Sequence, residues 1–160
     1  MSITLPEATP PPAPGARDAS ATSKANRRRR ILVVDDDTLI CQIYSEALFR
    51  SGYQVDSAHD GEVGWQTLHA VRHDPDSYDL LITDNNMPKL SGVELVKKLR
   101  SERMMLPVIM ATSAPPADSE ELQLTAILPK PFYPDQLVQT VKEILDATHS
   151  SDASDTPLKM

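Results

Sequence analysis

Short apolar runs alternate along this chain with stretches in which apolar residues recur every three or four positions. The runs cover residues 31–34, 80–82, 107–111 and 126–129, and residues 53–55 begin a further extended segment. Continuous apolar runs of this length are typical of strands buried on both faces of a parallel sheet. Helical spacing between the runs predicts connecting helices, and right-handed crossovers place such helices on both faces. The fold class predicted is α/β, a doubly wound five-stranded parallel sheet.

Local signals mark where the predicted helices begin and end. Asp60-Gly61 opens the second helix, Ser91 and Glu94 form a capping box for the third, and Pro134 suits the first turn of the last. Gly52 fits the end of the first helix. Pro115 and Pro116 interrupt the chain before residue 119, so residues 119–124 have room for only one or two helical turns.

Composition divides the chain into three segments. Residues 1–28 are rich in Pro, Ala, Ser and Thr and end in a basic run, and we expect them to be disordered. Residues 29–147 carry the alternating pattern and form one domain, with no second domain expected. Residues 148–160 turn polar and are expected to form a disordered tail.

Charge and cysteine content limit the function classes. The chain has a net charge of −7, although residues 1–30 carry six basic and two acidic residues, so the domain itself is acidic and a poor nucleic-acid binder. The run Arg27 to Arg30 is either a solvated flank of the domain or a docking segment for an anionic partner; we favour the former. One cysteine, Cys41, and no long apolar run indicate a cytoplasmic protein without a membrane span.

Polar residues follow four of the predicted strands where each one ends. They are Asp35 and Asp36, Asp84, Thr112 and Lys130. The carboxyl ends of parallel strands share one edge of a sheet, so these side chains are expected to converge. Clustered carboxylates repel one another, which favours binding of a hard cation such as Mg²⁺. With an ammonium and a hydroxyl nearby, the edge suits a phosphoryl group on Asp84.

These motifs identify the chain as similar to the receiver domains of two-component response regulators. The matching segments are Val33-Val34-Asp35-Asp36, Asp84-Asn85-Asn86-Met87-Pro88 with Ser91-Gly92, Thr112-Ser113 and Lys130-Pro131-Phe132. The resemblance implies a flavodoxin-like receiver fold and a phosphoacceptor signalling protein rather than an enzyme beyond self-phosphorylation and self-dephosphorylation. It implies phosphate from a histidine kinase or a histidine phosphotransfer protein, and an effect exerted through protein contacts on a downstream target. Messenger, relay and phosphate sink all stay open.

The same resemblance assigns roles to individual residues. Asp84 is implied as the phosphoacceptor. Asp36 and Asp84 are implied to bind Mg²⁺ or Mn²⁺ directly, Asp35 mostly through water, and Asn86 through its backbone carbonyl. Thr112 and Lys130 are implied to contact the phosphoryl group.

Two positions depart from the family pattern. The switch position three residues before the lysine is Ile127, where the family usually has an aromatic residue. Thr112 and Lys130 are only 18 positions apart, which predicts that the fourth helix is shortened or missing. We therefore expect a switch that lacks the aromatic residue. In this switch the segment after Thr112 is mobile without phosphate and becomes ordered when the domain is phosphorylated.

Three other functions fit parts of the sequence less well. A phosphatase of the haloacid-dehalogenase type also uses an aspartate nucleophile and Mg²⁺, but its first-strand motif fails at Leu39. A flavodoxin-like cofactor binder needs a phosphate loop without the repulsion of three aspartates. His69 and His73 are spaced for a metal pair on a helix, but they lack a third ligand and are expected to be two exposed histidines.

Overall fold

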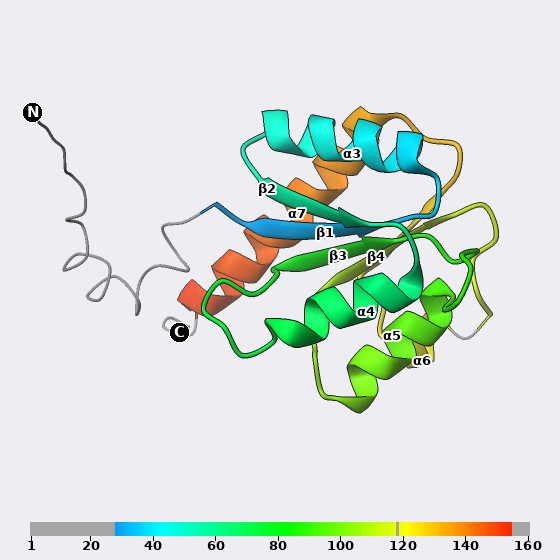
Figure 1. The fold of residues 1–160 in the computed structure, drawn as a ribbon. Coiled ribbons are helices and arrows are strands. Elements are labelled where there is room, and N and C mark those ends of the chain that lie inside the picture. Colours follow the sequence, from blue (N-terminus) through cyan, green and yellow to red (C-terminus); the bar gives the residue numbers. More distant parts are fainter. Residues whose placement is uncertain (1–27, 118, 155–160) are drawn as a thin grey trace, which may run out of the picture.

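The computed structural model describes residues 28–117 and 119–154, and its centre is a parallel sheet (Figure 1). The strands are β1 (Arg30–Val34), β2 (Gln54–Ala58), β3 (Leu80–Thr83), β4 (Val108–Thr112) and β5 (Ala126–Pro129). All pairs are parallel and the order is β2-β1-β3-β4-β5. Val34 pairs with both Ala58 and Thr83, and Thr112 pairs with Pro129, so the carboxyl ends of the strands meet at one edge. The predicted fold class is confirmed.

Helices cover both faces of the sheet. They are α3 (Thr38–Arg50), α4 (Gly61–Ala70), α5 (Gly92–Ser101), α6 (Ser119–Leu122) and α7 (Pro134–Ser154). Helices α3 and α7 lie on one face, and α4 and α5 lie on the other (Figure 1). The described part of the chain contains no helix that is both long and apolar enough to cross a membrane.

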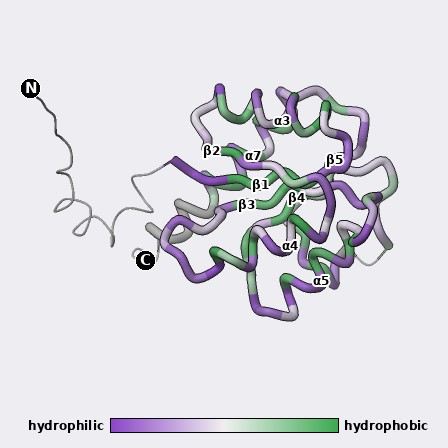
Figure 2. The backbone as a smooth tube through the Cα atoms, viewed as in Figure 1, coloured by the Kyte–Doolittle hydropathy of each residue, from purple (hydrophilic) through white to green (hydrophobic). Residues whose placement is uncertain are grey.

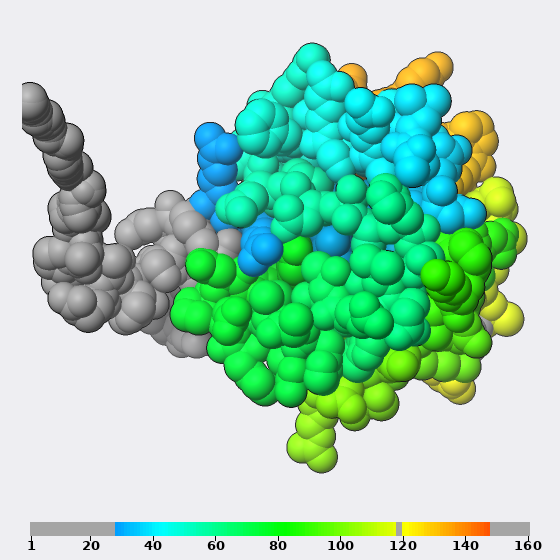
Figure 3. Space-filling model, viewed as in Figure 1, coloured from blue at the N-terminus to red at the C-terminus, as the bar shows by residue number. Residues whose placement is uncertain are grey.

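Alternation along each strand divides the core into two clusters. Ile31 and Val33 of β1 point towards α3 and α7, whereas Leu32 and Val34 point towards α4 and α5. The strands form the hydrophobic centre of the backbone trace (Figure 2). In the space-filling view, β1 shows only as small blue patches between its neighbours (Figure 3). Helices cover both faces of β1, which explains why its residues are apolar at every position and do not alternate with polar ones.

Side-chain caps fix the helix starts next to the strand ends. Asp37 caps α3 by accepting from the N–H groups of Leu39 and Ile40, and Asp60 caps α4 by accepting from Val63. The predicted capping box of Ser91 and Glu94 is present at the start of α5. Each cap satisfies backbone donors that would otherwise lack partners in the helix.

The connection between β4 and β5 confirms the expected shortening. Helix α6 has four residues, which is a single turn. Arg100 of α5 anchors the end of α6, because its guanidinium donates to the carbonyl oxygens of Leu122 and Gln123.

The carboxyl-terminal end of the domain differs from the boundary expected from composition. The expected boundary at residue 147 is wrong for the helix, because α7 continues to Ser154. Between Pro134 and Pro157 the sequence has no Gly or Pro that would end a helix, and a polar composition alone does not end one. The expected disorder of residues 1–27 and 155–160 lies outside the described residues.

The end of the basic run is part of the fold. Arg30 is the first residue of β1, and its guanidinium pairs with Asp56 at 3.1 Å and lies over the ring of Tyr78. The interpretation of the run as a simple solvated flank is therefore wrong for Arg30, because its position in the strand brings it against β2 and the start of β3.

Candidate functional site

Asp84 lies one residue beyond β3, on a loop that is held at both ends. Its N–H donates to the carbonyl oxygen of Val34 at 3.0 Å, which extends the ladder between β1 and β3 by one bond. Its Oδ1 accepts from the N–H of Asn85 at 2.6 Å. Asn85 in turn accepts from the first two N–H groups of α5, through its carbonyl oxygen from Gly92 and through Oδ1 from Val93. The loop and the start of α5 therefore form one hydrogen-bonded unit.

The carboxylates of Asp35, Asp36 and Asp84 lie close together, as expected from their positions directly after β1 and β3. One ligand atom from each residue lies within 4.8 Å of the others. Asp35 is 3 % exposed, Asp84 is partly exposed, and Asp36 faces solvent. Burial raises the pKa of Asp35 above its usual value, and the nearby Asp84 adds to that effect, although the Asp37 N–H and Lys130 oppose it. Such a group of hard oxygens, part buried and part open to water, fits Mg²⁺ or Mn²⁺.

Lys130 lies one residue beyond β5 and contacts two of these three carboxylates. Its Nζ lies 3.2 Å from Asp35 Oδ2 and 3.4 Å from Asp84 Oδ2. Burial by itself would lower the pKa of Lys130, but the two carboxylates outweigh it, and the pKa is raised. The side chain is therefore a permanent cation at neutral pH, held between residues that follow two different strands.

The three other predicted site residues, Thr112, Asn86 and Ile127, lie on β4, on the Asp84 loop and on β5. Thr112 is fully buried at the end of β4, and its hydroxyl accepts from the N–H of Ala114 at 3.2 Å. Its carbonyl oxygen accepts from the N–H of Lys130, which joins the two strand ends. Asn86 lies on the exposed part of the Asp84 loop, and Ile127 is half-buried on β5, opposite Met110. The structure thus brings Asp35, Asp36, Asp84 and Lys130 into direct proximity.

Reasoning from sequence missed two residues of this region. Asn85 was quoted only as part of a motif, yet its side chain holds the start of α5; an Asn eight residues before Val93 carries no local signal for that bond. The second residue is Tyr44 of α3. Its ring stacks on Phe132, with centroids 5.3 Å apart, and such a contact between distant segments has no signature in sequence spacing.

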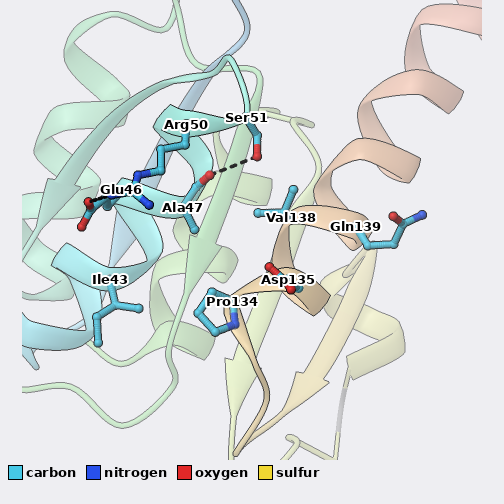
Figure 4. Close-up of a pocket in the computed structure, with 9 residues that line it drawn as sticks. All are labelled: Ile43, Glu46, Ala47, Arg50, Ser51, Pro134, Asp135, Val138 and Gln139. Atoms are coloured by element: carbon cyan, nitrogen blue, oxygen red, sulfur yellow. Dashed lines mark hydrogen bonds and ion pairs between the residues drawn. The ribbon is translucent and has the colours of Figure 1, made fainter.

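The histidines and the surface grooves lie apart from this site. The ring of His69 is half-buried, 4.8 Å from that of Trp65, and its Nε2 lies 3.8 Å from Glu102 at the end of α5. The expectation of two exposed histidines is therefore wrong for His69. Within the described ranges, the aspartate group is the one cluster with metal-ligand geometry. A groove of about 660 Å³ between α3 and α7 is lined by residues including Ile43, Glu46, Pro134 and Val138, and the strand-end residues do not line it (Figure 4).

Comparison with known proteins agrees with this geometry. Residues 31–142 match the family model described as the response regulator receiver domain. The chain belongs to this family. As a receiver domain, it is a signalling module of two-component systems, and the matches give no support to the phosphatase or flavodoxin-like alternatives.

Relatives of the receiver domain include both longer regulators and single receiver structures. The alkaline phosphatase synthesis transcriptional regulatory protein PhoP of Bacillus subtilis is 36% identical over 124 residues, which are 73% of this chain but 48% of PhoP. The chain thus spans about half the length of the curated relatives it matches. The CheY-like receiver domain protein from Methanospirillum hungatei aligns with a TM-score of 0.68 and 29% identity, covering 78% of this chain and 98% of that one. The response regulator TrrA from Thermotoga maritima, solved in complex with Mg²⁺-BeF, aligns with a TM-score of 0.62 and 31% identity, covering 72% and 97%.

Proposed function

We propose that this receiver domain accepts a phosphoryl group on Asp84 and signals through protein contacts. The observation that carries the proposal is the position of Lys130, with its ammonium within 3.4 Å of carboxylates that follow β1 and β3. A cation held there can neutralise both the acceptor and the oxygens of an incoming phosphoryl group. The Asn85 N–H orients Oδ1 of Asp84 and leaves Oδ2 on the side of Lys130.

A divalent cation fits the carboxylate group, and we assign Asp35, Asp36, Asp84 and the backbone carbonyl of Asn86 to hold it. The raised pKa of Asp35 supports this assignment, because burial next to Asp84 leaves negative charge that a cation relieves. When bound, Mg²⁺ or Mn²⁺ would supply further neutralisation of the phosphoryl oxygens. TrrA, a similar response regulator, was solved in complex with Mg²⁺-BeF, which is consistent with a divalent cation in this family.

The proposed reaction transfers a phosphoryl group from a histidine nitrogen of the donor to a carboxylate oxygen of Asp84. A carboxylate oxygen of Asp84 forms a bond to the phosphorus of a phosphohistidine, the P–N bond breaks, and the released imidazole takes up a proton. Lys130 stays protonated throughout and contacts the oxygens of the transferred phosphoryl group. The Thr112 hydroxyl, which accepts from the Ala114 N–H in this structure, rotates to donate to the phosphoryl group. The donor is a histidine kinase or a histidine phosphotransfer protein, and the signal passes to a downstream protein.

Labelling with a small phosphodonor such as acetyl phosphate, in the presence of Mg²⁺, tests the proposal. Wild-type protein should acquire one acid-labile, hydroxylamine-sensitive phosphoryl group, and Asp84→Asn should acquire none. Asp74→Asn is a matched control, because Asp74 is exposed in the turn after α4. Undiminished labelling of Asp84→Asn would show that another residue is the acceptor.

A further inference from the structure

The main chain of Asp84 is held on both sides by hydrogen bonds. Its N–H donates to the carbonyl oxygen of Val34 at 3.0 Å. Its carbonyl oxygen accepts from the hydroxyl of Thr83 at 2.8 Å, and Thr83 is fully buried at the end of β3. The remaining freedom of Asp84 is rotation of its side chain, so the direction of the carboxylate depends on the contacts of its two oxygens.

Asn85 supplies the contact that fixes one of these oxygens. Its N–H donates to Asp84 Oδ1 at 2.6 Å, whereas Oδ2 lies 3.4 Å from the ammonium of Lys130. The N–H keeps Oδ1 in place only as long as the main chain of Asn85 is itself held. What holds Asn85 therefore also decides which oxygen of Asp84 faces Lys130.

Asn85 is held by the first turn of α5. Its carbonyl oxygen accepts from the N–H of Gly92 at 2.9 Å, and its side-chain Oδ1 accepts from the N–H of Val93 at 3.0 Å. Both donors belong to a helix start, where N–H groups have no partner within the helix. A residue without a side-chain acceptor would keep the first bond and lose the second, so the amide oxygen is the feature particular to Asn85.

We propose that Asn85 is a positioning residue for phosphoryl transfer. Its side-chain bond to α5 fixes the N–H that holds Oδ1 of Asp84, and this presents Oδ2, beside Lys130, to the phosphodonor. Oδ2 then forms the bond to phosphorus with its own electron pair, while the bond from phosphorus to the donor breaks and the leaving group keeps that bond's electrons. A fixed carboxylate reacts faster because less orientation has to be achieved in the transition state. The inference rests on the proposed function of Asp84.

The test measures the rate of phosphorylation by acetyl phosphate at saturating Mg²⁺, together with thermal unfolding. Asn85→Leu has a similarly branched side chain without an acceptor. It should be phosphorylated about three- to tenfold more slowly, the range that one hydrogen bond supplies. Asn85→Asp keeps an acceptor oxygen for the Val93 N–H and should regain most of the lost rate.

Ser91→Ala is the matched control for the effect on the helix. The Ser91 hydroxyl accepts from the N–H of Glu94 at 3.1 Å, so this variant also removes a side-chain acceptor from the first turn of α5. Its unfolding temperature should fall about as much as that of Asn85→Leu. Because the Ser91 hydroxyl bonds to the helix and not to the Asp84 loop, the variant should be phosphorylated like the wild type.

The outcomes separate the two proposals. A wild-type rate in Asn85→Leu refutes the positioning role and leaves the assignment of Asp84 intact. Equal slowing of Asn85→Leu and Ser91→Ala, or an Asn85→Asp variant as slow as Asn85→Leu, assigns Asn85 to helix capping alone and also refutes the role. Failure of the wild-type protein to become labelled refutes the proposed function, and the positioning role with it.

Discussion

Replacement of Gly92 by alanine tests how closely the start of α5 is joined to the Asp84 loop. A Cβ at this position would overlap the carbonyl oxygen of Asp84 and would lie 2.9 Å from the Cα of Asn85. Both neighbours are backbone atoms, so no side-chain rotation relieves the overlap. The loop and the helix must therefore move apart.

The cost of that movement follows from the bonds that cross the contact. The Gly92 N–H donates to the Asn85 carbonyl oxygen at 2.9 Å, and the Val93 N–H donates to Asn85 Oδ1 at 3.0 Å. Losing or stretching both costs about 2 kcal/mol. Displaced packing beneath the helix start adds about 1 kcal/mol, so we expect a loss of about 3 kcal/mol, or roughly 6 to 12 °C in unfolding temperature.

Gly52→Ala is the control for this prediction. Gly52 has φ of 102°, and a Cβ there would meet nothing within 4 Å, so the variant suffers only backbone strain of about 1 to 2 kcal/mol. Thermal unfolding by circular dichroism and acetyl phosphate labelling are measured on both variants. Gly92→Ala should be labelled about tenfold or more slowly, because the Asp84 backbone is displaced, while Gly52→Ala keeps the wild-type rate. Wild-type labelling by Gly92→Ala would refute the reasoning.

Three further predictions concern the same edge of the sheet. Asp36→Ala should lose most of its Mg²⁺ affinity by calorimetry; a wild-type protein that binds no Mg²⁺ would contradict the assigned metal site. The raised pKa of Asp35 means that its contribution to stability is present below the unfolded pKa of 3.8 and is lost as pH rises through the folded pKa. Without metal, Asp35→Asn should therefore gain stability relative to wild type between pH 4 and pH 7 in urea unfolding, and an unchanged difference would argue against the shift. Hydrogen exchange between Thr112 and Leu122 should slow on phosphorylation; equal protection in both states would place the signal on another face.

The parts of the fold that were predictable share strong local signals. The run at 31–34 is buried on both faces, and the box of Ser91 and Glu94 caps α5, because each depends on neighbours in sequence. The shortness of α6 also followed from Pro115, Pro116 and the limited length of chain between β4 and β5. The end of α7 and the burial of His69 were not predictable, since the first lacks a stop signal and the second depends on α5 packing beside α4.

The amino-acid sequence by itself determined the order of strands and helices and which residues follow each strand. These properties depend on periodicity and capping, which act over a few residues. Tertiary structure alone decided that Lys130 lies between Asp35 and Asp84 and that the ring of Tyr44 stacks on that of Phe132. Those relations join segments up to 95 positions apart, and only strand order, sheet register and packing of α3 on the sheet bring such segments within hydrogen-bond distance.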